Sequence, residues 1–426
     1  MSAPGWAEMV RVFGRIGLLS FGGPAAQIGL MHRELVDREG WLDEATYLRA
    51  LSLCMLLPGP EAMQLATYAG WRLRGVPGGL LAGGLFVLPG AAVIAALALL
   101  YARFGQVPMV EAAFLGIKAA VVIVVVQALR RLAGKALGAP GALWIAALAF
   151  AGIFALGLPF PLIVAAAGLW GLITARSAAS APAPGSAKPA PMRATGWTVA
   201  VWGVLWLVPL ITLSLAGAEL LAGLGWFFAK LAVVTFGGAY AVLGYMTQEV
   251  VQNHGWITTG EMIDALGLAE TTPGPLILVT QFVAMLAGEA RGGAGLALAA
   301  GAVALWATFV PCFLWIFAAA PHLEALAARP RLAGALAAIT AAVVGVIANL
   351  TLWFALHVLF ARVGRVEIGP FSLPLPELSS LDPAALILMA LAAALMQGLR
   401  AGMGRGLALM AGAGLLFGQG IQWLNL

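Results

Sequence analysis

The sequence predicts an all-α, polytopic membrane protein built from two homologous halves. Of its 426 residues, 62% are hydrophobic and only 10% are charged, whereas a soluble domain carries about 25% charged residues. Its apolar runs often exceed the roughly 18 residues that mark a membrane-spanning helix. A block of motifs also occurs twice with one constant separation, which is the pattern of an internal duplication.

The duplicated block begins with a Gly-Gly motif and ends with a Pro-Gly-Pro turn. The first copy reads S-F-G-G-P-A-A-Q at 20–27, and the second reads T-F-G-G-A-Y-A-V at 235–242. Every matched residue lies 215 positions from its counterpart. The later matches are Glu34 with Glu249, Trp41 with Trp256, and Pro58–Pro60 with Pro273–Pro275. A hydrophobic unit duplicated around Gly/Pro breaks is typical of transporters whose site lies between two repeats.

The first repeat, residues 1–175, is expected to hold broken segments followed by full spans. Broken helices are tolerated at membrane depth where protein or a watery cavity surrounds the irregular backbone. The short or charged segments lie at 6–21, 25–38, 44–57 and 60–74. The expected spans lie at 77–102, 109–129, 140–157 and 159–175.

The two repeats are joined by a linker and an unpaired span. A Pro/Ala/Ser-rich stretch at 176–196 cannot pack a core and is expected to be a cytoplasmic linker. The run at 197–216 has no partner in the first half and is expected to be a connecting transmembrane helix. The second repeat, 217–426, has broken segments near 221–236, 239–252, 260–272 and 275–288. Its expected spans lie near 292–319, 332–358, 383–399 and 406–424.

Loop charges predict that the repeats are inverted. The loop at His32–Glu44 carries Arg33 and Arg38, whereas its counterpart at Thr247–Thr259 carries no Lys or Arg. The positive-inside rule puts the first loop in the cytoplasm and the second outside. The same reasoning puts the Pro-rich loop at Arg362–Asp382 outside.

The four breaks are predicted to form an anion site. Paired glycines let the backbone leave helical geometry, and a proline suits the first position of a new helix. Four helix N-termini would then meet near one midplane, where their positive ends favour an anion. The alternative is that these points only allow kinks or close packing. The residues concerned are Gly22, Gly23, Pro24, Gly59, Pro60, Gly237, Gly238, Gly274 and Pro275.

Basic and polar side chains near the breaks are further candidates for substrate binding. Arg15 and Lys230 are counterparts, each seven residues before the first glycine of a break. A cation inside a membrane segment usually faces a cavity or a partner, and two of them suit a doubly charged anion. The alternative is that both snorkel to an interface. The hydroxyl and amide candidates are Ser20, Gln64, Thr235 and Thr272, with Ser20 and Thr235 expected as hydrogen-bond donors.

One lysine and three glutamates complete the candidate set. Lys118 lies mid-span and is expected either to face a cavity, the preferred interpretation, or to pair with a carboxylate. Glu34 and Glu249 would act in gating or coupling, although a solvated interfacial face is the commoner alternative. Glu61 starts a helix, where the dipole stabilises a carboxylate. It is either an ordinary first-turn acid or a proton carrier that vacates when an anion binds.

No enzyme signature is present in the sequence. HExxH, GxSxG, Walker A and Cys/His cluster motifs are all missing, so neither catalysis nor a cofactor or metal is expected. The net charge of +5 comes from basic residues scattered at segment ends, which argues against nucleic-acid binding and fits a membrane protein. Energy for transport would come from an ion gradient, exchange or the membrane potential.

The F-G-G-P, H-R-E, Trp and P-G-P pattern resembles the chromate ion transporter family in its long, two-domain form. The resemblance implies a multi-pass inner-membrane protein that exports chromate and confers chromate resistance. It also implies sulfate as an alternative oxyanion, since family members are linked to both. One departure is Ala239, which stands where the first copy has Pro24. A transporter of another small anion and an anion channel remain alternatives, and a homodimer is left open.

Overall fold

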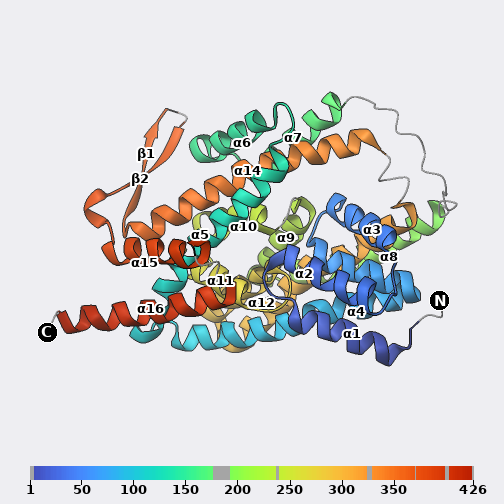
Figure 1. Ribbon diagram of the computed structural model, residues 1–426, viewed down its shortest axis with the longest axis horizontal. Coiled ribbons are helices and arrows are strands. Elements are labelled where there is room, and N and C mark those ends of the chain that lie inside the picture. The colour runs from blue at the N-terminus through green and yellow to red at the C-terminus, as the bar shows by residue number, and fades with distance from the viewer. Residues whose placement is uncertain are drawn as a thin grey trace. The chain divides into compact units, whose positions relative to one another are not determined.

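The computed structural model describes residues 4–175, 192–236, 239–323, 329–369, 371–398 and 403–424. Helices make up nearly all of it (Figure 1), which confirms the all-α class. Most of the expected linker at 176–196 lies outside the described residues, as do Gly237 and Gly238. In the described part, five helical stretches are long and apolar enough to cross a membrane: Glu61–Phe104, Pro108–Ala136, Met192–Leu215, Leu276–His322 and Arg331–Leu359.

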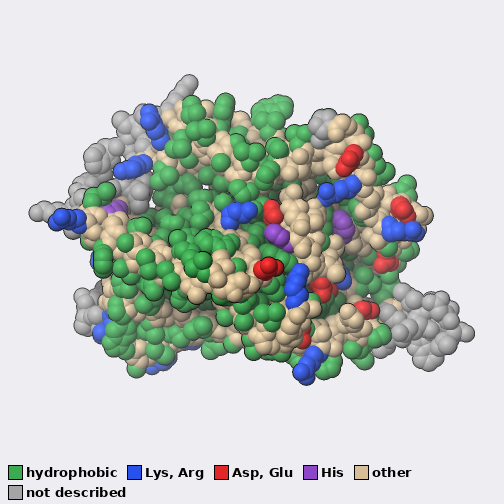
Figure 2. Space-filling model, turned by 180° about the vertical axis from the view of Figure 1, so that it is seen from behind, with side chains coloured by type: hydrophobic (Ala, Val, Ile, Leu, Met, Phe, Trp, Pro, Cys, Tyr) green, Lys and Arg blue, Asp and Glu red, His purple; other side chains and the backbone are tan. Residues whose placement is uncertain are grey.

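Three expected spans form shorter helices than the sequence suggested: α6 (Ala142–Leu156), α7 (Phe160–Thr174) and α15 (Pro383–Ala393). The fourth, α16 (Met403–Leu424), has 22 residues and covers the expected span at 406–424. Hydrophobic side chains nonetheless dominate the face shown in Figure 2, with charged groups scattered among them. Large exposed residues such as Trp144, Leu148 and Trp197 suit contact with lipid.

Two compact units make up the fold, and each draws on both halves of the chain. Unit 1 contains Met1–Ala98, Leu169–Val242 and Thr272–Leu336. Unit 2 contains Leu99–Gly168, Leu243–Thr271 and Ala337–Leu426. Each unit therefore takes segments from both copies of the repeat.

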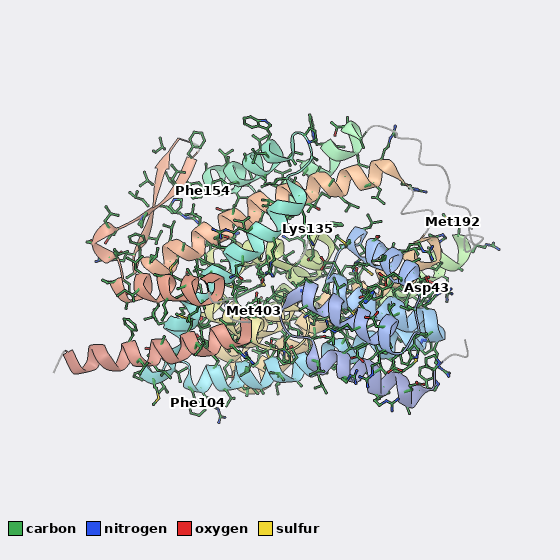
Figure 3. The ribbon with its side chains drawn as sticks, viewed as in Figure 1. Asp43, Phe104, Lys135, Phe154, Met192 and Met403 are labelled. Carbon is green, nitrogen blue, oxygen red and sulfur yellow. The ribbon has the colours of Figure 1, made fainter. Side chains whose placement is uncertain are left out.

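Unit 1 holds the helices around the predicted breaks. Its first half contributes α1 (Trp6–Leu19), α2 (Gly23–His32), the π-helix η1 (Arg33–Arg38), α3 (Glu44–Leu56) and most of α4 (Glu61–Phe104). Its second half contributes α8 (Met192–Leu215), α9 (Glu219–Val234) and α12 (Val279–Ala319), and α12 packs on both α8 and α9. Figure 3 labels Asp43, whose side chain caps α3 by accepting the Thr46 N–H at 2.8 Å.

Sharp kinks divide both α4 and α12 where the sequence suggested separate segments. The backbone leaves helical geometry at Arg74 and Gly75 in α4, and at Gly292 and Gly293 in α12. Gly75 has φ +62° and Gly293 has φ +68°, values that glycine adopts at little cost. The helix bends at these points and then continues, so each pair of expected segments forms one kinked helix.

Unit 2 is organised around α5 (Pro108–Ala136). This helix packs against α11 (Thr259–Thr271), α15 and α16. Small residues bring the backbones close, because a Cβ on Gly116 would collide with the Met410 carbonyl and one on Gly414 with the Ala112 carbonyl. Unit 2 also contains α6, most of α7, the end of α10 (Ala239–Thr247), η2 (Gln248–Asn253), most of α14 (Pro330–Leu359), η6 (Ala394–Gly398) and a β-hairpin.

The hairpin was not expected from the sequence. Within the loop at Arg362–Asp382, β1 (Val363–Ile368) pairs antiparallel with β2 (Phe371–Pro376), in a register that sets Val363 opposite Pro376. Prolines in β2 argue against a strand in the interior of a sheet. A two-stranded sheet has only edge strands, however, and edge strands accommodate proline.

The duplicated sequences fold alike in local detail. After α2 and α10, both copies form a six-residue π-helix, η1 in one and η2 in the other. The Trp41 N–H then donates to the Leu35 carbonyl at 2.9 Å, and the Trp256 N–H donates to the Val250 carbonyl at 2.8 Å. These paired irregularities indicate two homologous repeats.

Candidate anion site

Three of the four predicted breaks interrupt helices within the described residues, and the fourth, at Gly237 and Gly238, lies outside them. The Gly-Gly break lies between α1 and α2, and its counterpart lies between α9 and α10. The first Pro-Gly-Pro turn separates α3 from α4, and the second separates α11 from a 3-10 turn at Leu276–Leu278 that leads into α12. The first N–H groups of each new helix have no partner within that helix.

At these breaks each repeat donates one backbone hydrogen bond to the other. The Gly59 N–H of the first turn donates to the Thr235 carbonyl of the second repeat at 2.8 Å. The Gly274 N–H of the second turn donates to the Ser20 carbonyl of the first repeat at 2.9 Å. Because both donors and both acceptors are repeat counterparts, the two bonds are related by a pseudo-two-fold within unit 1.

Glycine is required in the turns for both conformation and space. Gly59 has φ +117° and Gly274 has φ +92°, which side chains rarely adopt. A Cβ on Gly59 would lie 2.8 Å from Gln64 Nε2 and 3.0 Å from Cys312 Sγ. On the other side, α4 approaches the second turn so closely that a Cβ on Gly90 would collide with the Pro273 carbonyl. The turns are thus held from several sides.

A small cavity lies where the helix starts meet. Its volume is about 10 Å³, the room of about one water. The residues that line it are Pro24, Gln27, Pro60, Glu61, Ala62, Thr235, Ala239, Pro275, Leu276 and Ile277. The structure therefore brings together Pro24, Pro60, Pro275, Thr235 and Glu61 from the set that the sequence predicted. All four chain breaks contribute to this lining.

Gln27 is a member of the site that sequence reasoning missed. Its buried amide Nε2 donates to the Ser20 carbonyl at 3.2 Å and to the Gly274 carbonyl at 2.7 Å. It thereby ties the first Gly-Gly break to the second Pro-Gly-Pro turn. The residue ends the S-F-G-G-P-A-A-Q motif, but its counterpart Val242 is apolar, so the duplication offered no signal for it.

The hydroxyls and amide at the breaks are used differently from the prediction. The Ser20 and Thr235 hydroxyls donate to Ile16 and Leu231, the carbonyls one turn earlier, both at 2.6 Å. Because each hydroxyl has a single proton, neither is available as a donor to an anion in this arrangement. Gln64 Nε2 donates to the Pro58 carbonyl at 2.6 Å, which braces the turn, and no described residue bonds its Oε1.

The two basic counterparts do not line this cavity. Arg15 forms a salt bridge with Glu34, and the other cation near Glu34 is Arg38 at 3.8 Å. Glu34 is buried, with its side chain 11% exposed, so its solvated alternative is wrong. Lys230 is exposed on α9. The predicted pair of cations therefore lies apart from the cavity that the helix starts form.

Lys118 is paired with a carboxylate in unit 2, which is the less preferred of its two alternatives. Its Nζ lies 3.3 Å from Asp264 Oδ2, and the Tyr101 hydroxyl donates to the same oxygen at 2.7 Å. Asp264 is 4% exposed, and its Oδ1 has no hydrogen-bond partner among the described residues. Sequence reasoning missed Asp264 because its counterpart in the first repeat is Arg49.

The remaining predicted site residues are divided between the two units. Glu61 begins α4 and lines the cavity, and no salt bridge within the described residues involves it. Thr272 is buried beside the second turn in unit 1. Glu249 belongs to unit 2, where its Oε2 lies 3.9 Å from His254 Nε2.

Comparison with known proteins supplies a family for this arrangement. The family model described as chromate transporter matches residues 7–172 and 222–418. A chromate transport protein of Pseudomonas aeruginosa is 34% identical over 370 residues, which cover 85% of this chain and 84% of that protein. One of Cupriavidus metallidurans is 30% identical over 350 residues, which cover 80% of each chain.

A shorter relative corresponds to part of the chain only. An uncharacterized transporter of Bacillus subtilis is 31% identical over 162 residues, which cover 90% of that protein but 37% of this chain. A protein about the length of one repeat is what a duplicated architecture leads one to expect. No solved structure matches the chain.

Proposed function

We propose that this chain, which belongs to the chromate transporter family, carries chromate across the membrane as a secondary transporter. Two relatives that match over most of their length are named chromate transport proteins. The observation that supports the proposal most strongly is the cavity formed by all four helix breaks. Unpaired N–H groups and the positive ends of helix dipoles suit a tetrahedral dianion there.

In this proposal the backbone binds the anion and the side chains hold the backbone in place. Gln27 and the two exchanged bonds from Gly59 and Gly274 fix the breaks against one another. Preorganised N–H donors bind an anion without the cost of being reoriented. Arg15 and Lys230 would then act on the approach of the anion, because neither lines the cavity.

Glu61 gives the proposed site a means of coupling to protons. Its carboxylate and the anion would occupy the same small cavity at the start of α4. Two negative charges so close disfavour one another strongly at low dielectric. We therefore expect Glu61 to be protonated when the anion is bound, which would link anion movement to a proton.

The small volume of the cavity supports an alternating-access cycle. Room for about one water does not admit a tetrahedral oxyanion. The helix starts must therefore separate to receive the ion and close again around it. Inverted repeats would allow this opening on either side of the membrane in turn. Export of chromate across an inner membrane, and the chromate resistance that it would give, are further parts of the proposal that rest on the family resemblance.

Chromate flux into proteoliposomes tests the function directly. The purified protein is expected to give saturable chromate uptake that protein-free liposomes lack. A response to an imposed pH gradient would support proton coupling, and it should be reduced in Glu61→Gln. Absence of chromate flux in a preparation that transports sulfate would overturn the substrate while keeping the site.

An anion channel is the alternative function, and a counterflow assay in the same vesicles distinguishes it from a carrier. A carrier shows counterflow, in which unlabelled anion on one side accelerates uptake of labelled anion from the other. A channel shows flux that follows the membrane potential without counterflow. The small volume of the cavity favours the carrier, since conduction of an oxyanion needs more room than about 10 Å³.

A further inference from the structure

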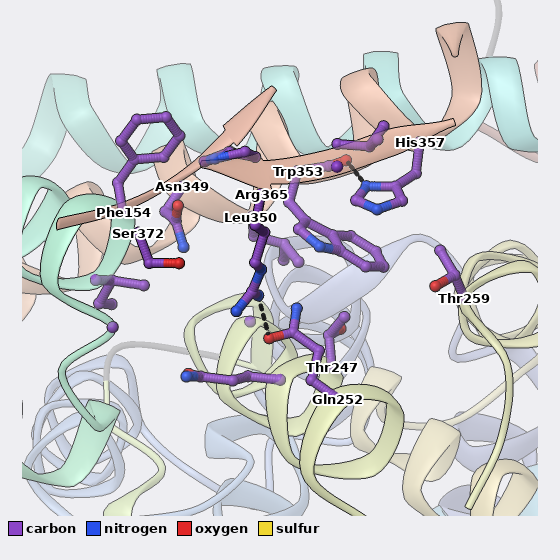
Figure 4. A pocket seen from close by; sticks show the side chains of 17 residues that line it. Phe154, Thr247, Gln252, Thr259, Asn349, Leu350, Trp353, His357, Arg365 and Ser372 are labelled. Atoms are coloured by element: carbon purple, nitrogen blue, oxygen red, sulfur yellow. Dashed lines mark hydrogen bonds between the residues drawn. The ribbon is translucent and has the colours of Figure 1, made fainter. Parts of the chain in front are cut away.

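A second, larger cavity lies in unit 2 beneath the β-hairpin. Its volume is about 260 Å³, enough for a small oxyanion with several waters, since about 10–15 Å³ on this measure holds one water. The walls come from the end of α6, from α10 and η2, from α14 and from both strands (Figure 4). The Pro-rich loop at Arg362–Asp382 thus forms one side of a binding-sized space.

The described residues that line this cavity favour an anion. They include Arg365 and His357, several amide and hydroxyl side chains, and no carboxylate. The Arg365 side chain extends from β1 to Gln252, where its Nη2 donates a hydrogen bond to Gln252 Oε1 at 2.6 Å (Figure 4). A guanidinium carries five N–H donors, so a single bond to Gln252 leaves donors for a ligand.

Other polar groups line the same cavity as Arg365. Asn349 on α14 offers an amide and Thr259 on α11 offers a hydroxyl. His357 Nδ1 lies 2.9 Å from the Trp353 carbonyl, and its ring contacts the Trp353 ring in a tilted arrangement, with centroids 4.2 Å apart and an interplanar angle of 32°. The Trp353 indole lies in the wall of the cavity beside Arg365 (Figure 4).

We propose that the hairpin cavity is a second anion site, which binds a small divalent oxyanion through Arg365. The planar guanidinium matches two oxygens of such an ion at once. The proposal rests on the proposed function for the identity of the ion, with chromate and sulfate as the ions of matching shape. Because the loop at Arg362–Asp382 is expected outside the cytoplasm, the site would meet the anion on the external side.

The competing interpretation is that Arg365 only pins the hairpin to Gln252. Arg362 provides a matched control because it lies on the same loop but does not line the cavity. Its Nε lies 3.1 Å from Glu377 Oε2, and its side chain is 71% exposed. Arg362→Gln therefore removes a hairpin cation of the same type without changing the proposed site.

Tryptophan fluorescence of the purified full chain measures binding. Chromate absorbs where tryptophan emits, so the part of the quenching that Trp353→Phe abolishes reports chromate bound near Trp353, and variants of the lining residues then assign it to this cavity. Arg365→Gln is expected to weaken that part roughly tenfold or more, as loss of a charged hydrogen-bonding group does. Arg362→Gln should leave it unchanged. Asn349→Leu, which leaves the Arg365–Gln252 bond in place, should also weaken it, and added sulfate should compete.

Two results would overturn the second site. One is equal quenching in Arg365→Gln and Arg362→Gln, and the other is a wild-type titration with no component that depends on Trp353. If either occurs while the wild type transports chromate, the proposed function stands and only the second site fails. If the Trp353 signal appears without transport, the anion site stands and the transport function fails.

Discussion

Replacing Gly59 by alanine tests whether the geometry of the Pro-Gly-Pro turn builds the anion site. Its φ of +117° lies where a side chain costs roughly 1–2 kcal/mol. The new Cβ would also lie 2.8 Å from Gln64 Nε2 and 3.0 Å from Cys312 Sγ. Both distances are below the 3.4 Å at which ordinary contact begins, and overpacking adds about 1–3 kcal/mol.

The two effects together predict a loss of about 2–5 kcal/mol in the free energy of unfolding. Relief of the crowding would displace Gly59 and stretch its 2.8 Å hydrogen bond to the Thr235 carbonyl. Chromate flux per folded protein should therefore fall at least tenfold, since a misplacement of about 1 Å in a binding site can cost about a hundredfold.

Two control glycines separate the effect of backbone strain at a positive φ from the effect of steric crowding by the new Cβ. Gly141 has φ +83°, and a Cβ there would meet nothing within 4 Å, so Gly141→Ala carries strain alone. Gly84 is helical and equally open, so Gly84→Ala should be neutral or slightly stabilising. Thermal unfolding in detergent and proteoliposome flux are measured on all three variants. If Gly59→Ala loses no more stability or flux than Gly141→Ala, the role assigned to the turn is refuted.

Three further predictions address other contacts. Gln27→Leu leaves the buried Gly274 carbonyl without its amide donor and should lower the free energy of unfolding by about 1–3 kcal/mol. Chromate flux per folded protein should also fall, and a variant with normal flux would exclude the bridging role. Asp264→Asn leaves the Lys118 charge unbalanced and should cost about 3 kcal/mol. Adding Lys118→Met should restore part of that stability, and strict additivity of the two changes would contradict the ion pair. His32, the last residue of α2, lies 2.6 Å from Glu44 and 3.3 Å from Asp37, and the hydrogen bond to Glu44 raises the pKa of His32 above its ordinary value of 6.5. Its contribution to stability is therefore complete below about pH 6.5 and is lost as the pH rises through the raised pKa. The thermal midpoint of the wild type should fall relative to His32→Gln across that range, and parallel pH profiles would contradict the pairing.

The sequence predicted the features that depend on local backbone chemistry. Glycine and proline act on their own φ angle and hydrogen bond, so the breaks at Gly22 and Gly59 could be placed before any tertiary contact was known. The constant separation of the two copies then located the matching breaks in the second repeat. Half of the residues that line the small cavity belong to the set predicted in this way: Pro24, Pro60, Glu61, Thr235 and Pro275.

Pairings between distant segments could not be predicted in the same way. Arg15 and Glu34 are 19 residues apart, and Lys118 and Asp264 come from different repeats. Which carboxylate meets which cation depends on how helices pack, and a local pattern of residues does not encode that packing. Comparison of the repeats also hides any residue whose counterpart differs, which is why Gln27 and Asp264 left no signal.

The central claim is that an oxyanion binds where the four helix breaks of unit 1 meet. Chromium scatters X-rays anomalously, so crystals of the protein grown with chromate would locate the ion without assumptions about its ligands. The account predicts an anomalous peak beside Pro24, Pro60 and Pro275, in a cavity wider than its present volume of about 10 Å³. A transport-competent preparation whose crystals show bound chromate elsewhere, and none at these helix starts, would contradict it.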